Sequence, residues 1–291
     1  MIRTLFTFIK KSDLLTIQIV ESGSTVGIDI LKRNNVRVSG QGEKTLLFGH
    51  GFGCDHRVWN NTIKEFEGDY RVATFDYVGS GDSDKAAYSK ERYSTLDGYK
   101  QDLLEVCDAL GLKQMIFVGH SVSAMIGMLA SIERPELMEK MIMIGPSPYY
   151  MNEAGYNGGF EQTDIDELLD MMETNYKEWA KYLAPVVMQN EERPQLTEES
   201  EHLLCSNDPM IARQFAEVTF TSDLRDKLDQ VTVETLILQP KFDAIAPPEV
   251  GQYVHDHIAG SQMIVMEAVG HNPHLSDSAE TVKYIKAYLA N

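Results

Sequence analysis

The stretch "IFVGHSVSAMIGMLA" (residues 116–130) joins a strand-like run to a helix-like run at a single serine. The run before Gly119 is rich in β-branched and aromatic residues, and the run after Ser121 is rich in helix formers. When a strand enters a helix through Gly-x-Ser-x-small, the chain turns sharply and the serine hydroxyl projects from the sheet. Gly119 fits this pattern, and Ser123 stands where a second glycine is usual. The turn predicts Ser121 as a nucleophile; the alternative is a serine that only caps the helix.

The rest of the chain repeats this alternation of strands and helices. Between the strand-like runs, residues 95–111 place apolar side chains three or four positions apart, as an amphipathic helix does. Buried strands that alternate with helices favour an α/β fold with a mostly parallel sheet and helices on both faces. Upstream, residues 26–31 and 36–40 predict an antiparallel hairpin with its turn at Asn34-Asn35. The strand-like runs are residues 45–49, 71–77, 114–120, 140–145, 235–239 and 262–269.

Residues 149–230 interrupt this alternation. Helical periodicity is present at 164–184 and 209–220, and no strand-like run is found there. The segment carries 18 acidic and 6 basic residues, and therefore −12 of the net charge of −18. We interpret it as a helical cap, or lid, inserted into an α/β core formed by residues 28–148 and 231–291. The alternative is a solvated helical subdomain with no role in binding.

A serine nucleophile needs a base, and a carboxylate must hold that base in place. The apolar run 262–269 is followed by His271, and the run 235–239 is followed by a loop that contains Asp243. Ser121, Asp243 and His271 therefore each follow a strand-like run, and parallel strands present such residues at one edge of the sheet. Their order along the chain is that of the α/β-hydrolases. We predict that these three residues form a catalytic triad.

Acyl transfer by a serine also needs two backbone N–H groups that stabilise the oxyanion. One is predicted to belong to Val122, the residue after the nucleophile. The other is predicted in the loop "GHGFGC" (residues 49–54), where glycines flank Phe52 and let the backbone approach a substrate closely. The alternative is a glycine-rich turn with no catalytic part.

Other residues that could form a site favour structural roles. His274 is predicted to pack against its own loop, and Asp76 is predicted to brace the loop after a strand through backbone hydrogen bonds. His255 and His257 stand two positions apart on a predicted helix, where their side chains do not face each other. No metal site is therefore predicted. The glycine-rich stretches match neither a phosphate-binding loop nor a dinucleotide-binding pattern, so no cofactor is expected.

Composition and charge narrow the range of partners. A net charge of −18 argues against nucleic acid, which binds basic surfaces, and gives no support for binding to an anionic membrane. No apolar run approaches the roughly 18 residues that span a bilayer. Three widely spaced cysteines form neither a disulfide nor a zinc pattern and fit a reducing compartment. We expect a cytoplasmic protein whose residues 1–27 form an N-terminal extension that is either disordered or dispensable.

Seven segments carry a resemblance to a known family. They are "HGFGCDHRVW" (50–59), "FDYVGSGDSD" (75–84), "YSTLDGYKQDLLEVCDALGL" (93–112), "FVGHSVSAMIGMLASIERPEL" (117–137), "GGFE" (158–161), "DPMIARQFA" (208–216) and "GHNPHLS" (270–276). They resemble the RsbQ-like α/β-hydrolases, which regulate the bacterial general stress response. They are also similar to the related plant karrikin and strigolactone receptor hydrolases.

This resemblance extends the expectations from the residues alone. It implies an α/β-hydrolase fold with a sheet of the eight-stranded type and a four-helix cap over a small hydrophobic pocket. Phe160 and Phe220 are implied to line that pocket. The resemblance supports the triad and the two oxyanion donors named above. It also implies a small hydrophobic ligand or substrate, and a PAS-domain partner that is a phosphatase or kinase.

Two hypotheses about function remain after these observations. The first is a serine hydrolase that acts on a small apolar ester or lactone, in an RsbQ-like role in stress signalling. The second is a ligand-sensing signalling or binding protein with little or no turnover. Hydrolysis of a simple ester by the purified protein would separate the two.

Overall fold

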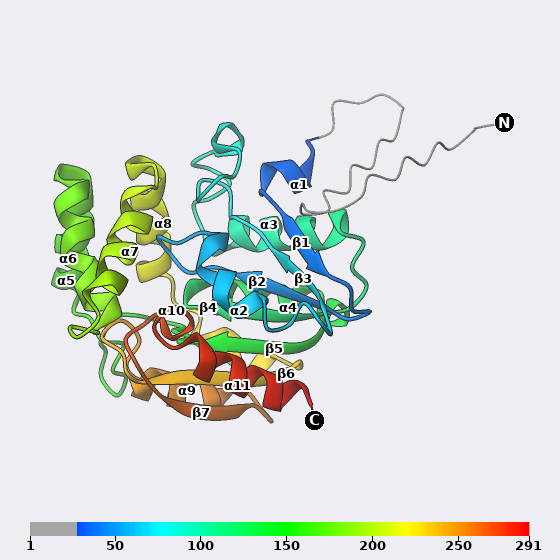
Figure 1. Ribbon diagram of the computed structural model, residues 1–291. Helices are drawn as coiled ribbons and strands as arrows, with labels where there is room; N and C mark the ends of the chain where they lie inside the picture. The colour runs from blue at the N-terminus through cyan, green and yellow to red at the C-terminus, as the bar shows by residue number, and fades with distance from the viewer. Residues whose placement is uncertain (1–27, 291) are drawn as a thin grey trace.

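A seven-stranded sheet forms the centre of the part of the chain that the structure describes (Figure 1). The computed structural model describes residues 28–290, so the predicted extension (residues 1–27) lies outside the described residues. The spatial order is β1-β3-β2-β4-β5-β6-β7; β1 is antiparallel to β3, and the other neighbours are parallel. The strands are β1 (Arg37–Gly40), β2 (Thr45–Gly49), β3 (Arg71–Thr74), β4 (Met115–His120), β5 (Met138–Ile144), β6 (Glu234–Phe242) and β7 (Gln262–Val269). The predicted α/β fold is confirmed, with seven strands over residues 28–290 where the resemblance implied eight.

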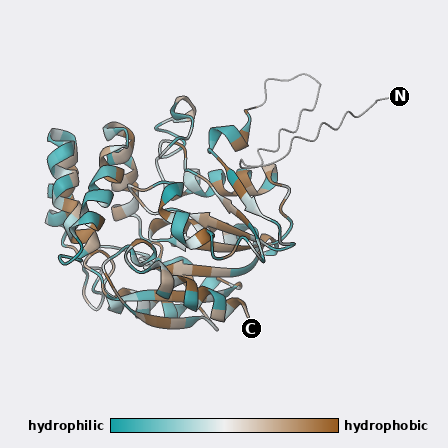
Figure 2. Ribbon diagram, viewed as in Figure 1, coloured by the Kyte–Doolittle hydropathy of each residue, from teal (hydrophilic) through white to brown (hydrophobic). Residues whose placement is uncertain are grey.

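Each face of the sheet has its own apolar core, because successive residues of a strand point to opposite faces. Leu46 and Phe48 of β2 belong to one core, whereas Leu47 between them belongs to the other. Helices α2 and α11 contribute to the first core, and α3, α4 and α9 contribute to the second. The strands are accordingly drawn largely in the hydrophobic colour (Figure 2). The helices around the sheet are α1 (Ile30–Arg33), α2 (Asn60–Ile63), α3 (Leu96–Ala109), α4 (Val122–Glu133), α9 (Pro248–His257), α10 (Pro273–Ser276) and α11 (Ser278–Leu289).

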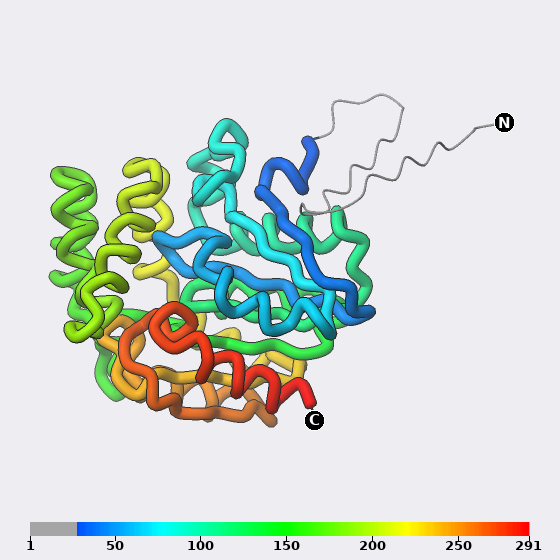
Figure 3. Tube along the Cα trace, in the orientation of Figure 1, coloured from blue at the N-terminus to red at the C-terminus, as the bar shows by residue number. Residues whose placement is uncertain are grey.

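Four helices inserted between β5 and β6 form a separate group, which we call the cap (Figure 3). The helical periodicity at 164–184 comes from two helices, because Asn175 ends the first and caps the second by accepting a hydrogen bond from the Glu178 N–H at 3.4 Å. The cap has its own apolar cluster, which includes Trp179 and Phe220. Its helices are α5 (Gln162–Thr174), α6 (Tyr176–Met188), α7 (Pro194–Cys205) and α8 (Pro209–Thr221). In the described part of the chain, no helix has both the length and the apolar character needed to cross a membrane.

The predicted N-terminal hairpin is wrong. Residues Ile30–Arg33 form the short helix α1, and β1 pairs with β3. Asp29 caps this helix by accepting a hydrogen bond from the Lys32 N–H at 3.3 Å. Arg33 then makes an ion pair with the buried carboxylate of Asp102 on α3 at 3.2 Å. This long-range ion pair holds the segment against α3. The ion pair cannot be predicted from the local pattern of apolar residues, on which the hairpin prediction was based.

The register of the sheet places the loops of interest together. Gly49 at the end of β2 lies opposite Gly119 of β4, and His120 lies opposite Ile144 at the end of β5. Ile144 in turn lies opposite Leu238 of β6. The loops that follow these four parallel strands therefore leave the sheet at the same edge, which is where such folds place their sites.

Candidate active site

The turn between β4 and α4 holds Ser121 in a backbone conformation that is rare for serine. Its φ is +56° and its ψ is −123°, so the residue lies outside the regions that side-chain-bearing residues normally occupy. Gly119 permits the turn, because a Cβ there would lie 2.7 Å from the carbonyl group of Ser123. The strained turn directs the start of α4 away from the strand and leaves the serine at the edge of the sheet.

The structure brings Ser121, His271 and Asp243 together in one chain of hydrogen bonds. Ser121 Oγ lies 2.7 Å from His271 Nε2, and His271 Nδ1 lies 2.7 Å from Asp243 Oδ2. The other carboxylate oxygen accepts hydrogen bonds from the N–H groups of Ile245 and Ala246 at 2.8 and 3.0 Å. Since a carboxylate only accepts, His271 Nδ1 carries the proton, and Nε2 is free to accept from the serine hydroxyl. This is the arrangement of a serine nucleophile with an oriented base.

The backbone of His271 is fixed on both sides. Its N–H donates to the carbonyl of Val187, at the end of α6 in the cap, at 2.7 Å. Its carbonyl accepts from Nε2 of the buried His120 at 2.7 Å. Burial, with the nearby rings of His274 and His271, holds the pKa of His120 well below its usual value, so this imidazole is neutral. The position of the base therefore depends on both the core and the cap.

The loop after β2 brings Phe52 into the same cavity lining as Ser121. The carbonyl of Gly51 is held by His50 Nδ1 at 2.9 Å and by the Cys54 N–H at 3.2 Å. The described chain has no cis peptide, so the Phe52 N–H points away from that carbonyl. A Cβ built on Gly51 would lie 3.5 Å from Ser121 Cβ, which shows how close the loop comes.

Val122 is the first residue of α4, and its N–H therefore has no acceptor within the helix. The Phe52 N–H donates to no backbone carbonyl in the described residues. The two predicted donors thus follow the adjacent strands β2 and β4, Phe52 in the loop after β2 and Val122 at the start of α4. An oxyanion that forms on a substrate carbonyl needs two such unpaired N–H groups.

His50 sets the orientation of this loop as a neutral side chain. Its Nε2 accepts a hydrogen bond from the Tyr77 N–H at 3.3 Å, so its proton is on Nδ1, which donates to the Gly51 carbonyl. Burial lowers the pKa of His50 and keeps the ring uncharged, against the opposing charge of Asp76. Sequence reasoning did not find this role, because His50 looked like one more residue of a glycine-rich turn.

Ser123 also has a specific role, which explains why it can replace glycine. Its buried Oγ donates to the His50 carbonyl at 2.5 Å and lies 2.8 Å from the hydroxyl of Tyr77. The Ser123 hydroxyl has one hydrogen, and it donates that hydrogen to the His50 carbonyl. The hydroxyl of Tyr77 must therefore be the donor in its contact with Ser123 Oγ. The hydroxyl of Ser123 thus connects the nucleophile turn to the start of the loop that carries Phe52.

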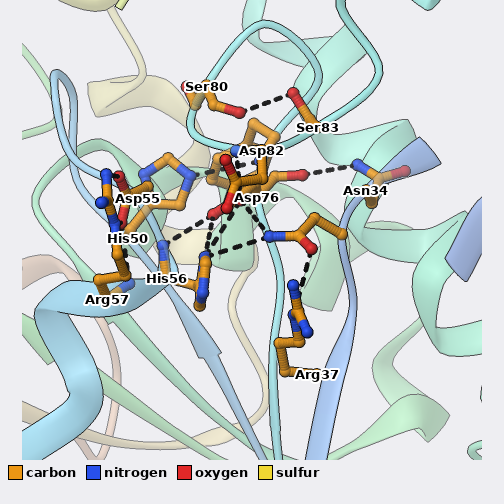
Figure 4. A network of polar contacts seen from close by, with 12 residues as sticks. Asn34, Arg37, His50, Asp55, His56, Arg57, Asp76, Ser80, Asp82 and Ser83 are labelled. Carbon is orange, nitrogen blue, oxygen red and sulfur yellow. Dashed lines mark hydrogen bonds and ion pairs between the residues drawn. The ribbon is translucent and has the colours of Figure 1, made fainter. Parts of the chain in front are cut away.

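A second network braces the same loop from behind (Figure 4). Asp76 accepts hydrogen bonds from the His56 N–H at 2.7 Å, the Asp82 N–H at 3.0 Å and Asn35 Nδ2 at 2.8 Å. His56 Nδ1 lies 3.0 Å from the same carboxylate. Burial alone would raise the pKa of Asp76, but the contacts with His56 and the hydrogen bond from Asn35 hold it below its usual value. The predicted bracing role of Asp76 is confirmed.

Asp55, His56 and Asp76 also bring their possible metal-binding atoms within 4.8 Å of one another. The Asp55 carboxylate is already engaged by Arg57, with contacts of 2.9 and 2.5 Å. The Asp76 carboxylate is engaged by the donors named above. These protein contacts account for the cluster as a structural brace, and we assign no ion to it.

A small cavity that opens partly to solvent lies between the triad and the cap. Phe220 lines it, as the resemblance implied. Phe160 does not; its ring packs against that of Phe220 at 5.9 Å and so supports the wall from behind. The lining residues are Phe52, Gly53, Cys54, His120, Ser121, Tyr150, Leu183, Val187, Ser200, Leu204, Thr219, Phe220, Ile245, His271 and Asn272.

Tyr150 is a cavity residue that sequence reasoning missed. Its hydroxyl lies 3.4 Å from Ser121 Oγ, and burial raises its pKa to about 12, so it stays protonated. It follows β5, and the rule that found the triad at the ends of strands would also have found it. His274, by contrast, stacks on Trp59 with ring centroids 4.4 Å apart. Its predicted structural role is confirmed, but it packs against the segment His56–Trp59 and not only against its own loop.

We predict that replacing Asp76 with asparagine lowers the free energy of unfolding by about 2–4 kcal/mol, because an amide oxygen cannot accept the same set of hydrogen bonds and the charge beside His56 is lost. Urea unfolding measures the change. Asp82→Asn is the matched control, since Asp82 contributes its backbone N–H and its side chain is exposed. Equal stability of the two variants would show that the Asp76 carboxylate is not a brace.

We predict that Ser123→Ala and Ser123→Gly each lower kcat for p-nitrophenyl acetate about tenfold, with a smaller change in KM. Both variants leave the buried His50 carbonyl without its donor, which costs about 1–3 kcal/mol and loosens the loop that carries Phe52. Ser131→Ala is the control, because it removes a buried hydroxyl of the same helix that donates to Met128 at 2.7 Å. A wild-type kcat in both Ser123 variants would refute the positioning role.

Comparison with known proteins agrees with this geometry. Residues 44–278 match the family described as alpha/beta hydrolase fold. The chain is 38% identical over 262 residues to Strigolactone esterase D14 of Arabidopsis thaliana, covering 90% of this chain and 98% of that protein. It is 39% identical over 244 residues to Karrikin insensitive 2 receptor CA of Petunia hybrida, covering 84% of this chain and 90% of that receptor.

The solved structure of a hydrolase from Oleispira antarctica is 42% identical in sequence. It superimposes with a TM-score of 0.88 and covers 90% of this chain and 97% of its own. The predicted similarity to plant karrikin and strigolactone receptor hydrolases is therefore confirmed. The chain belongs to the alpha/beta hydrolase fold family.

Proposed function

We propose that this protein is a serine hydrolase that cleaves a small, largely apolar ester or lactone, with Ser121, His271 and Asp243 as its catalytic triad. The observation that carries the proposal is the unbroken chain of two 2.7 Å contacts from Asp243 through His271 to Ser121. The nucleophile opens onto a cavity lined mainly by apolar side chains. Relatives named as esterases support the same reaction class.

The first half of the reaction forms an acyl-enzyme. Ser121 Oγ attacks the carbonyl carbon while His271 Nε2 takes the hydroxyl proton, and the carbonyl oxygen becomes an oxyanion. The N–H groups of Phe52 and Val122 donate to that oxyanion. As the C–O bond to the alcohol breaks, His271 returns the proton to the leaving oxygen. Asp243 stabilises the imidazolium form of His271 throughout.

The second half releases the acid. His271 takes a proton from a water molecule, whose oxygen attacks the acyl carbon, and a second oxyanion forms in the same hole. Collapse of this intermediate breaks the bond to Ser121 Oγ, and His271 returns the proton to the serine. In a lactone the alcohol remains attached to the acyl group, so one ring-opened hydroxy acid leaves at the end.

A signalling role is the second candidate, because a relative 39% identical to this chain is named as a receptor. In this form of the proposal the protein acts in an RsbQ-like stress pathway, and the acidic cap contacts a PAS-domain phosphatase or kinase. The three free cysteines fit the cytoplasmic location that such a role requires. The resemblance in sequence supports the partner class. Ligand sensing with little turnover is the alternative to catalysis in that role.

We predict that the wild-type protein hydrolyses p-nitrophenyl acetate and that Ser121→Ala lowers kcat by at least about 10³-fold, since the remaining site lacks a nucleophile. Absorbance of the released nitrophenol measures the rate. Ser94→Ala is the control, because Ser94 is exposed and its hydroxyl donates to the Glu91 carbonyl at 2.8 Å.

A fluorophosphonate probe gives a second readout that does not depend on the choice of ester. It should label wild-type protein at Ser121, as found by peptide mass spectrometry, and leave Ser121→Ala unlabelled. Absence of both labelling and turnover in folded wild-type protein would favour the ligand-sensing alternative.

Recovery of a PAS-domain phosphatase or kinase with the tagged protein from a native lysate would support the signalling role, and its repeated absence would count against it.

A further inference from the structure

Apart from His120 Nδ1, which lies against Gly51, two polar atoms of residues that line the cavity have no hydrogen-bond partner within the described protein. Thr219 Oγ1 on α8 and Asn272 Oδ1 beside the triad are both in this state. Thr219 and Asn272 are only 3% and 5% exposed, respectively. Both residues line the cavity that contains Ser121. Leaving a buried polar group unpaired costs free energy, so a ligand that pairs with it gains affinity.

Thr219 differs from the neighbouring hydroxyls on its own helix. Thr221 Oγ1 donates back to the Glu217 carbonyl at 2.7 Å, and Ser222 Oγ donates back to the Val218 carbonyl at 2.5 Å. This return to the preceding turn is the usual way for a hydroxyl to satisfy itself on a helix. Thr219 makes no such bond, and its buried hydroxyl is unpaired in a residue that lines the cavity.

Asn272 lies next to the base of the triad in the sequence. Its Nδ2 lies 3.5 Å from the sulfur of Met188, which is a weak acceptor, and its Oδ1 has no partner. If the amide is turned over, an unpaired donor takes the place of the unpaired acceptor. A hydroxyl on the ligand satisfies either orientation, because it can both donate and accept.

The cavity selects against charged groups. The residues that line it include no lysine or arginine, so a carboxylate or phosphate on the ligand would be buried without a counter-charge. Burial keeps His120 neutral and Tyr150 protonated at neutral pH. Apolar side chains such as Leu183, Leu204 and Ile245 supply most of the remaining wall. The wall is therefore mainly apolar, and Thr219 and Asn272 place unpaired polar atoms in it.

We infer that the substrate is a neutral, hydroxylated ester or lactone, with a hydroxyl near the reacting carbonyl that bonds to Asn272 and a further polar group that bonds to Thr219. This inference rests on the proposed function and narrows its substrate class. Asn272 lines the same cavity as Ser121, and we therefore place the hydroxyl that bonds to it on the acyl side of the substrate. A simple hydrocarbon ester reaches the nucleophile but leaves both polar groups unpaired.

The test compares α-hydroxy-γ-butyrolactone with α-methyl-γ-butyrolactone, which differ by a hydroxyl and a methyl of similar size. Acid release with a pH indicator measures kcat/KM for each lactone. Wild-type protein should prefer the hydroxylated lactone by about tenfold to a hundredfold, the range that one buried hydrogen bond supplies. Asn272→Leu, and to a smaller extent Thr219→Val, should reduce this preference toward unity. Thr221→Val is the control and should retain the wild-type preference, because its hydroxyl is already paired.

The outcomes distinguish this inference from the proposed function. Turnover of p-nitrophenyl acetate without any preference between the lactones would overturn the inference alone, and would mean that water satisfies Asn272 and Thr219. A preference that survives in both variants would also overturn it. Failure to turn over any ester would overturn the proposed function itself. The comparison on wild-type protein needs no variant, so a poorly folded variant cannot leave the question undecided.

Discussion

The close approach of β4 to the first turn of α4 is the constraint on which the site depends. A residue with φ +56° that is not glycine costs of the order of 1–3 kcal/mol, and the surroundings must compensate for that cost. Here the Ser121 N–H donates to the Ile144 carbonyl at 2.8 Å, and the Ser121 carbonyl accepts from the Ala124 N–H at 2.9 Å. These two bonds fix the turn from a neighbouring strand on one side and from the helix on the other. The hydroxyl of Ser121 is thus positioned by the sheet itself.

The cap is connected to the loops that carry the acid and the base of the triad. The Val187 carbonyl accepts the His271 N–H at 2.7 Å, and Gln189 Oε1 accepts the Ala244 N–H, next to Asp243, at 3.1 Å. Asn207, between α7 and α8, donates to the Gly53 carbonyl in the oxyanion loop at 3.1 Å. These bonds join the cap to the loops that carry Phe52, Asp243 and His271. This coupling is compatible with catalysis and with ligand sensing on the same scaffold.

Much of this arrangement could be predicted from the sequence because it follows strand ends. Ser121, Asp243 and His271 each come after an apolar run, and the parallel sheet then brings those ends to one edge. The paired roles of Ser123 and Tyr77 could not be predicted, since 46 positions separate the two hydroxyls and no periodicity links them. The N-terminal hairpin was predicted wrongly for the same reason, because the ion pair between Arg33 and Asp102 joins residues that are far apart in the sequence. Tyr150 could have been predicted in the same way as the triad, because it also follows a strand that ends at this edge of the sheet.

The distribution of charge bears on the last step of the proposed reaction. Hydrolysis of an ester converts a neutral substrate into a carboxylate, and the cavity lining offers no lysine or arginine to hold that anion. The segment 149–230, which contains the cap, carries 18 acidic and 6 basic residues and therefore a strongly negative net charge. A neutral ester enters such a site without an electrostatic penalty, whereas the carboxylate product is repelled from it. The acidic cap and the uncharged cavity therefore act in the same direction, because both favour binding of the uncharged substrate over retention of the product.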